Sequence, residues 1–95
     1  MKKIRTPFFE IGTKNYIYGD DVLALAKKAD ELAEKYDIDV LLTTPYADIR
    51  RVAENTKNII IIAPYMDTLY PGRGMAAVLP ESLKAAGAHG VGVNH

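Results

Sequence analysis

Hydrophobic residues recur at every third or fourth position between residues 20 and 37, in the stretch DDVLALAKKADELAEKYD. This period is typical of an amphipathic helix that lays one apolar stripe on a core and exposes charged side chains on the other side. Asp20 is the expected N-cap, because its side-chain oxygen can accept a hydrogen bond from a free amide of the first turn. The expected stripe consists of Val22, Leu25, Ala26, Ala29, Leu32, Ala33 and Tyr36.

Four other stretches are rich in the β-branched and aromatic residues that favour β-strands. They are residues 4–14, 38–44, 58–63 and 89–94. Pro7 has no amide hydrogen, so strand pairing in the first stretch is expected to begin after it. Residues 59–62 are four consecutive isoleucines without a polar face. Such a run indicates a strand that is covered on both sides.

Two shorter stretches are predicted to be helices. In the first, residues 47–56, the inward positions are Ile49, Val52 and Ala53. The second, residues 79–87, has Pro80 near its first turn, where the missing amide hydrogen of proline does no harm. Gly87 is expected to end this helix, since glycine adopts the left-handed conformation common at helix C-termini.

The predicted elements alternate in the order βαβαβαβ over a chain of 95 residues, which fits one small α/β domain. This alternation is typical of parallel strands joined by right-handed helical crossovers. Neither a linker nor a low-complexity segment divides the chain, so residues 1–95 are expected to form a single domain. Four parallel strands can form an open sheet or half of an eight-stranded barrel, and both use the same repeating unit.

Acidic and basic residues balance at twelve each, so the chain lacks the net positive field that attracts nucleic acid. Arg50 and Arg51 form a basic pair that is expected to be a solvated edge. With no cysteine and two histidines, the composition argues against a disulfide framework and a metal site. No apolar run approaches the roughly 18 residues of a membrane span, and the start does not resemble a signal peptide. We therefore expect a cytoplasmic protein without metal, membrane or nucleic-acid partners.

Candidate chemistry gathers where the predicted strands end, because ligands of parallel α/β folds bind at the carboxyl ends of the strands. Lys14 and His95 close the first and last predicted strands. Side chains alternate along a strand, so Lys14 shares a face with Gly12, and His95 shares one with Val91. If both faces point to a common centre, an ammonium and an imidazole form an electrophilic pair for an anionic or carbonyl substrate. Alternatively, Lys14 is solvated and His95 is a frayed terminal residue.

The same loops contain two further features. The segment YPGRG, residues 70–74, has glycine amides and an arginine, and it either cradles a phosphate or forms a plain exposed loop. Five tyrosines also fall in the loops after the predicted strands: Tyr16, Tyr18, Tyr46, Tyr65 and Tyr70. Such amphipathic rings either form a contact surface or pack beneath the loops.

Taken together, GTKNY at residues 12–16 and PGRGMAAVLPESLKAAGAHGVGVNH at residues 71–95 resemble the triosephosphate isomerase family. The likeness runs over the whole chain and points to the shorter archaeal-type and bacterial triosephosphate-isomerase-like members. It implies a TIM (β/α)8 barrel, usually self-associating, that interconverts dihydroxyacetone phosphate and glyceraldehyde 3-phosphate in glycolysis without metal or cofactor. By this resemblance, Lys14 is the catalytic lysine that binds the substrate, and His95 is the catalytic histidine that polarises the substrate carbonyl.

Three positions depart from the family pattern: Gly12, Pro64 and Met75. The family usually has asparagine where Gly12 stands beside the substrate, so a related phosphorylated sugar such as a tetrose phosphate is a second candidate substrate. Family chains continue well beyond the Asn-His pair, and their glutamate base and closing loop lie there. We therefore expect an N-terminal half-barrel that lacks the glutamate base and is inactive alone. Glu10, two residues below Gly12 and toward the barrel interior, is a poor substitute for that base.

A half-barrel leaves its first and last strands with unpaired edges. The expected partners are therefore a second copy of the chain or a complementary C-terminal half, together with a small phosphorylated sugar as substrate. Two non-enzymatic alternatives remain. The chain is either a domain that binds a phosphate ligand or another protein, or a self-associating half-barrel scaffold.

Overall fold

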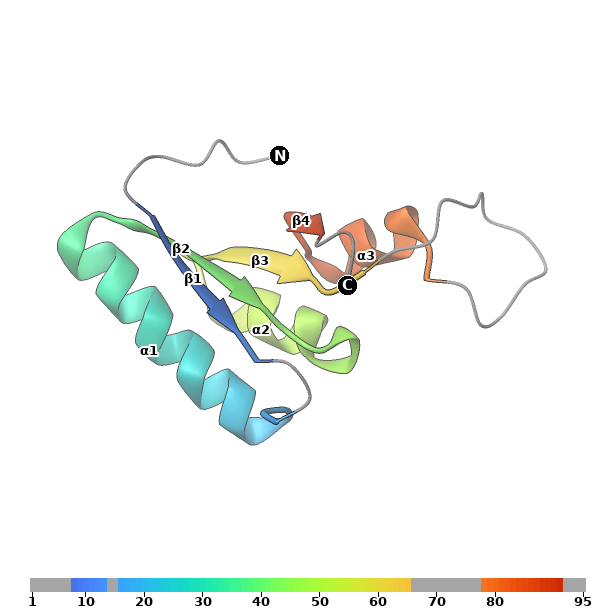
Figure 1. Cartoon of the computed structure of the whole chain (residues 1–95), viewed down its shortest axis with the longest axis horizontal. Coiled ribbons are helices and arrows are strands. Elements are labelled where there is room, and N and C mark those ends of the chain that lie inside the picture. The colour runs from blue at the N-terminus through green and yellow to red at the C-terminus, as the bar shows by residue number, and fades with distance from the viewer. Residues whose placement is uncertain (1–7, 14–15, 66–77, 92–95) are drawn as a thin grey trace.

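The structure, a computed structural model, describes residues 8–13, 16–65 and 78–91. Strands and helices alternate along this part of the chain, as the sequence predicts (Figure 1). The elements are β1 (Phe8–Gly12), α1 (Asp20–Tyr36), β2 (Asp39–Thr43), the 3-10 helix η1 (Tyr46–Asp48), α2 (Ile49–Asn55), β3 (Ile60–Ala63), α3 (Pro80–Ala86) and β4 (Gly90–Val91). Since β1 pairs from Phe8 onward, the prediction that pairing begins after Pro7 is confirmed.

All four strands are parallel, and they lie in the sheet in the order in which they occur in the chain. The register places Glu10 beside Leu41 and Leu41 beside Ile60. In doubly wound open sheets the strand order reverses at a switch point, whereas barrel strands follow one another around the axis. The sequential order therefore decides between the two architectures. The fold is a parallel βαβαβαβ sheet with the arrangement of half a TIM (β/α)8 barrel.

One face of the sheet, called the helix face below, packs against the helices, and the core lies between them (Figure 1). On this face Leu42 of β2 and Ile61 of β3 are buried together with Val22 of α1 and Val52 of α2. The other buried members of this cluster are Ala26, Ala29, Ala33, Val40, Ile49, Ile59, Ala63 and Leu83. Because every helix contributes to one cluster, removal of these apolar side chains from water stabilises the sheet and its helices together.

The opposite face of the sheet, called the inner face below, carries Glu10, Leu41 and Ile60 side by side. Leu41 and Ile60 are buried, whereas Glu10 is exposed. Ile59 and Ile61, on the helix face, are also buried, and the fourth isoleucine of the run is half-buried. The centre of β3 is therefore covered on both faces, as the run of isoleucines predicts.

The buried stripe of α1 is narrower than the sequence predicts. The buried residues are Val22, Ala26, Ala29 and Ala33, and Leu25 is half-buried. Leu32 and Tyr36 are 39% and 61% exposed, so the prediction that they belong to the stripe is wrong. Alanines along the contact line let the helix approach the sheet closely, and only this line is covered. The larger side chains at its margin remain in solvent.

Gly19 caps the N-terminus of α1, so the prediction that Asp20 is the N-cap is wrong. Gly19 has a φ of 63°, a conformation that glycine adopts without strain. Its amide donates a hydrogen bond to Oδ2 of Asp48 at 3.1 Å, which ties the start of α1 to the segment after β2. Asp20 is instead the first helical residue, and its carboxylate lies 2.6 Å from the guanidinium of Arg51.

A single carboxylate of α1 fastens the turn that leads into β3. Oδ1 of Asp30 accepts hydrogen bonds from the backbone amides of Lys57, Asn58 and Ile59. Backbone donors that leave water need a partner, and a charged acceptor makes stronger hydrogen bonds than a neutral one. Asp30 therefore joins α1 to the start of β3 across 27 to 29 positions of sequence.

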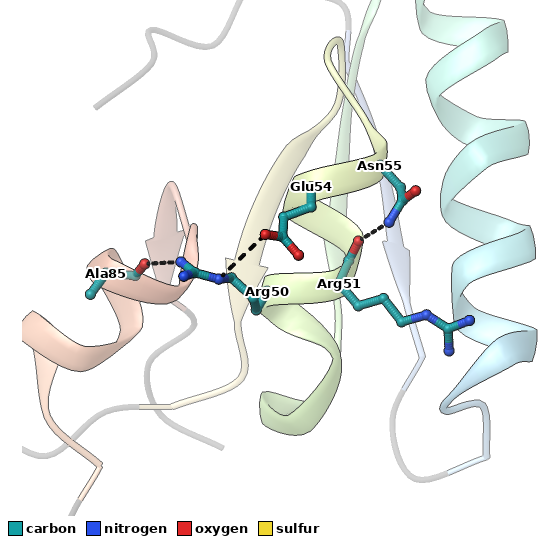
Figure 2. A network of polar contacts seen from close by, with 5 residues as sticks. All are labelled: Arg50, Arg51, Glu54, Asn55 and Ala85. Carbon is teal, nitrogen blue, oxygen red and sulfur yellow. Dashed lines mark hydrogen bonds and ion pairs between the residues drawn. The ribbon is translucent and has the colours of Figure 1, made fainter.

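A polar contact joins α2 to α3. Arg50 donates a hydrogen bond from Nη1 to the carbonyl of Ala85 at 3.0 Å, and its Nε lies 3.7 Å from a carboxylate oxygen of Glu54 (Figure 2). The side chains of Arg50 and Glu54 remain mostly exposed, as expected of a solvated edge. Ion pairs this exposed contribute little to stability. The hydrogen bond to Ala85 is a polar link between the two helices.

Gly87 ends α3 with a φ of 118°, which confirms the predicted end of this helix. Its amide donates to the carbonyls of Leu83 and Lys84, as in other left-handed helix ends. A Cβ at Gly87 would lie only 2.4 Å from the Cβ of Ala53 in α2. Two independent features therefore require glycine at this position: the left-handed backbone conformation and the close approach of α2.

Candidate site at the carboxyl ends of the strands

The carboxyl ends of the strands form one rim, and hydrogen bonds hold neighbouring strand ends together. The amide and the hydroxyl of Thr13 both donate to the carbonyl of Thr43, at 3.3 Å and 3.0 Å. The amide of Thr44 donates to the carbonyl of Ile62 at 3.2 Å. The part of the rim formed by β1, β2 and β3 is therefore a fixed platform from which the loops depart.

Gly12 is a predicted substrate-binding residue, and the structure places it at the end of β1. It lies on the inner face beside Thr43 and is exposed. A Cβ at Gly12 would meet no heavy atom within 4 Å. The space beside the end of β1 is therefore open, and a larger side chain or a ligand fits there without displacing a neighbour.

Lys14 and His95, the two predicted catalytic residues, lie outside the described residues. The described strand ends show from which face each chain segment departs. Gly12 lies on the inner face, whereas Val91 lies beside Ala63, which packs on the helix face. Regular alternation from Gly12 and from Val91 leads to opposite faces of the sheet. Alternation alone therefore does not bring Lys14 and His95 to a common centre, and their convergence stays a prediction.

Glu10 has the chemistry of a general base and lies on the inner face of β1, as the sequence predicts. It precedes Gly12 by two residues, so its backbone lies about 6.6 Å below the strand end, at about 3.3 Å per residue. A base must come within hydrogen-bond reach of the proton that it removes. This position below the rim makes Glu10 a poor base for a ligand held at the strand ends.

His89 has a structural contact that the sequence analysis missed. Its Nδ1 accepts a hydrogen bond from the amide of Ile61 at 2.9 Å, and its own amide donates to the carbonyl of Ile61 at 2.8 Å. The side chain therefore acts as a backbone partner for β3 just before β4 begins. No local pattern signals this role, since the partner lies 28 positions away.

Four exposed tyrosines lie in the segments that follow β1, β2 and β3. Tyr16 and Tyr18 are 86% and 68% exposed, and Tyr46 and Tyr65 are 40% and 45% exposed. The hydroxyl of Tyr46 donates to the carbonyl of Tyr65 at 2.8 Å, which links the segments after β2 and β3. Rings this exposed favour the contact-surface interpretation over packing beneath the loops. Tyr70 and the rest of the YPGRG segment lie outside the described residues.

Two kinds of feature are absent from the described residues. In residues 8–13, 16–65 and 78–91, no three His, Asp or Glu side chains are grouped so that they could hold a metal ion. Over the same ranges, no helix is both long enough and apolar enough to cross a membrane.

A parallel sheet in chain order, with its strand ends at one rim, defines the class of the chain as a (β/α)-barrel type protein. No family model matches it. Among curated proteins, the chain is 36% identical over its whole length to the triosephosphate isomerase of Methanobacterium bryantii, of which it covers 43%. It is 39% identical to that of Methanothermus fervidus over 81% of the chain, covering 34% of the relative. It is 32% identical to that of Saccharolobus solfataricus over 97% of the chain, covering 41%.

These similarities show that the chain belongs to the triosephosphate isomerase family. It spans about two fifths of the length of the relatives that it matches. This share fits the four parallel strands of the sheet, which are half the number in a (β/α)8 barrel.

Proposed function

We propose that the chain supplies one half of an aldose–ketose isomerase site for a small phosphorylated sugar. The observation that carries this proposal is the match to a triosephosphate isomerase at 36% identity over the whole chain. The rim of parallel strand ends supports it, because ligands of such folds bind there. The proposed unit is a single half-barrel domain, residues 1–95, which acts in the cytoplasm. A second copy could complete the barrel, but only a C-terminal half could also supply the missing base.

The reaction moves a proton between two carbons, one of which carries the carbonyl. It therefore needs a base and groups that stabilise negative charge on the carbonyl oxygen. In the proposal His95 donates a hydrogen bond to that oxygen, and Lys14 attracts the phosphate and the developing negative charge. Donors held in place before the reaction stabilise such charge most effectively. The proton-abstracting carboxylate comes from outside the 95 residues, because Glu10 lies below the rim.

Gly12 is proposed to border the substrate. The open space around its Cβ position gives room for a sugar phosphate with one more carbon than a triose, such as a tetrose phosphate. In an active assembly, the asparagine of Gly12→Asn should fill this space. Turnover of a tetrose phosphate should then fall about tenfold relative to turnover of a triose phosphate, because a pocket that is too small for one carbon lowers kcat/KM by at least that factor. Initial rates with both substrates measure the ratio. An unchanged ratio would show that Gly12 does not determine which sugar phosphate is converted.

The proposal is tested by assaying the chain alone and fused to the remaining part of the Methanobacterium bryantii enzyme. The chain alone should show no turnover of dihydroxyacetone phosphate, since it lacks a base at the rim. The fusion should be active, and His95→Ala should lower its kcat by about 100-fold or more. Tyr36→Ala is the matched control, because Tyr36 is an exposed side chain at the far end of α1. Turnover by the chain alone would contradict the proposal, as would a folded but inactive fusion.

The exposed tyrosines favour a second candidate, a binding domain without catalysis. Titration calorimetry with dihydroxyacetone phosphate distinguishes the two. Under the isomerase proposal, Lys14→Met weakens binding of the phosphorylated ligand by about tenfold or more, because the charge attracts the phosphate. Binding that is insensitive to Lys14→Met would instead favour recognition through the loops.

A further inference from the structure

Backbone contacts anchor the chain on both sides of Lys14. Before it, Thr13 is 3% exposed, and both its amide and its hydroxyl donate to the carbonyl of Thr43. After it, the amide of Tyr16 donates to the carbonyl of Thr13 at 3.3 Å, and Ile17 packs against the core cluster. Lys14, the proposed phosphate-binding residue, therefore lies in the sequence between residues that are held in place.

A buried carboxylate holds the far end of this segment, just before α1. The amide of Gly19 donates to Oδ2 of Asp48 at 3.1 Å, and Asp48 is only 8% exposed. A charged acceptor makes a stronger hydrogen bond to an amide than a neutral one does. The neighbouring pair of Asp20 and Arg51 is far more exposed, and ion pairs at the surface contribute little to stability. Asp48 is therefore the main polar anchor at this end.

Asp48 is itself attached to a well-packed part of the protein. It is the last residue of η1 and directly precedes α2. Its amide donates to the carbonyl of Pro45 at 3.0 Å. Ile49 and Val52, which follow it in α2, are both 0% exposed and belong to the core cluster. A side chain on a rigid element keeps its geometry more closely than one on a loop, so Asp48 can serve as a fixed point.

We propose that Asp48 is a positioning residue for Lys14. By holding Gly19, it fixes where the segment after β1 rejoins the body of the protein, and so where Lys14 stands relative to the strand ends. A lysine ammonium is a compact charge on a flexible stem, so the position of its backbone decides what it can reach. This inference rests on the proposed isomerase function, in which Lys14 attracts the substrate phosphate.

The test is a double-mutant cycle in the fusion protein described above, with dihydroxyacetone phosphate as substrate. Asp48→Ala should lower kcat/KM by about tenfold when Lys14 is present, because small displacements of a catalytic group are costly. In a Lys14→Met background the same change should lower it by less than about twofold, because residues that act as a unit are not additive.

A conservative variant repeats the cycle with less disturbance of the fold. Asp48→Asn keeps an oxygen acceptor but loses the charge, so it should lower kcat/KM by about threefold with Lys14 present and not further in Lys14→Met. Far-UV circular dichroism checks that each variant is folded. If Asp48→Ala does not fold, the Asp48→Asn cycle decides.

Asp30→Ala is the matched control. Asp30 also accepts backbone hydrogen bonds through its carboxylate, but it holds the turn before β3, at the end of the sheet away from the rim. Its loss should leave kcat/KM within about twofold. Inhibition by inorganic phosphate gives a second measurement, because this ion has no carbonyl and reports the attraction of phosphate alone. Its inhibition constant should rise in Asp48→Ala and stay unchanged in Asp30→Ala.

The possible failures separate this inference from the isomerase proposal. If Lys14→Met lowers activity but Asp48→Ala costs the same in both backgrounds, Asp48 supports the fold and not Lys14, and the inference alone is overturned. A loss at Asp48 no larger than that at Asp30 has the same meaning. If Lys14→Met is as active as the unchanged fusion, or if the folded fusion is inactive, the isomerase proposal fails and this inference fails with it.

Discussion

Two threonines at the ends of neighbouring strands are almost equally buried but differ in hydrogen bonding. Thr13 is 3% exposed and its hydroxyl donates to the carbonyl of Thr43 at 3.0 Å. Thr44 is 0% exposed, and its hydroxyl has no hydrogen-bond partner in the structure of the described residues. A buried hydroxyl without a partner destabilises the folded state, whereas a paired one is roughly neutral or favourable.

Thr44→Val should therefore stabilise the protein, and Thr13→Val should destabilise it. Valine keeps the shape of threonine but removes the hydroxyl, so we expect the free energy of unfolding to rise by about 1–2 kcal/mol at Thr44 and to fall by about 1 kcal/mol at Thr13. Urea denaturation followed by circular dichroism measures both. Equal losses at the two positions would show that an ordered water or another group satisfies Thr44.

Asp30 accepts three backbone hydrogen bonds through one oxygen, so its removal should be costly. We expect Asp30→Ala to lower the free energy of unfolding by about 2–3 kcal/mol, because partly buried amides lose a charged acceptor. Asp30→Asn retains an oxygen acceptor and should lose less. Glu31→Ala, an exposed neighbour on the same helix, is the control and should change stability by less than about 0.5 kcal/mol. Equal losses of stability at Asp30 and Glu31 would show that the hydrogen bonds to Asp30 do not stabilise the protein.

At the scale of elements, the approach of α2 to α3 depends on the absence of a side chain at Gly87. Gly87→Ala should lower the free energy of unfolding by about 2–4 kcal/mol, since it combines backbone strain with a clash against Ala53. Ala53→Gly in the same chain removes the clash but not the strain, so the double variant should recover part of the loss. Gly12→Ala, where the Cβ position is open, is the control. A double variant no more stable than Gly87→Ala would show that the strain alone is responsible.

The sequence predicts the existence of the helices and strands well, because hydrophobic period is a local property. It predicts their contacts less well. The N-cap of α1 depends on Asp48, which accepts from Gly19 across 29 positions of sequence, and no local pattern contains that information. Leu32 fits the period of the stripe, but its burial depends on how closely the alanines bring α1 to the sheet. Periodicity indicates which side of a helix faces the core and leaves the width of the contact undetermined.

The candidate site is predicted from sequence mainly through family resemblance. The resemblance of the surrounding motifs to triosephosphate isomerases predicts the roles of Lys14 and His95, and spacing alone leaves solvated and frayed alternatives open. Gly12 is the part of that assignment which the described residues include, and its open surroundings agree with a place beside a ligand. Side-chain alternation could not predict convergence, because Gly12 and Val91 lie on opposite faces of the sheet.

At the scale of the whole molecule, the alternation of elements predicts parallel strands but not their order. Strand order is a property of the complete sheet, and a βαβ unit looks the same in an open sheet and in a barrel. The structure resolves this with strands in chain order. Within the described residues, this order leaves β1 and β4 each paired on one side.

The order of the strands also bears on how the protein is made. Each strand pairs with the one that left the ribosome just before it, so the sheet can grow during synthesis without waiting for a distant segment. The turn held by Asp30 can form as soon as residues 57–59 have emerged, because α1 is by then already complete, and it fixes the start of β3 before the strand itself follows. The sheet can therefore grow in one direction during synthesis, with the most recently added strand offering its edge to the strand that emerges after it.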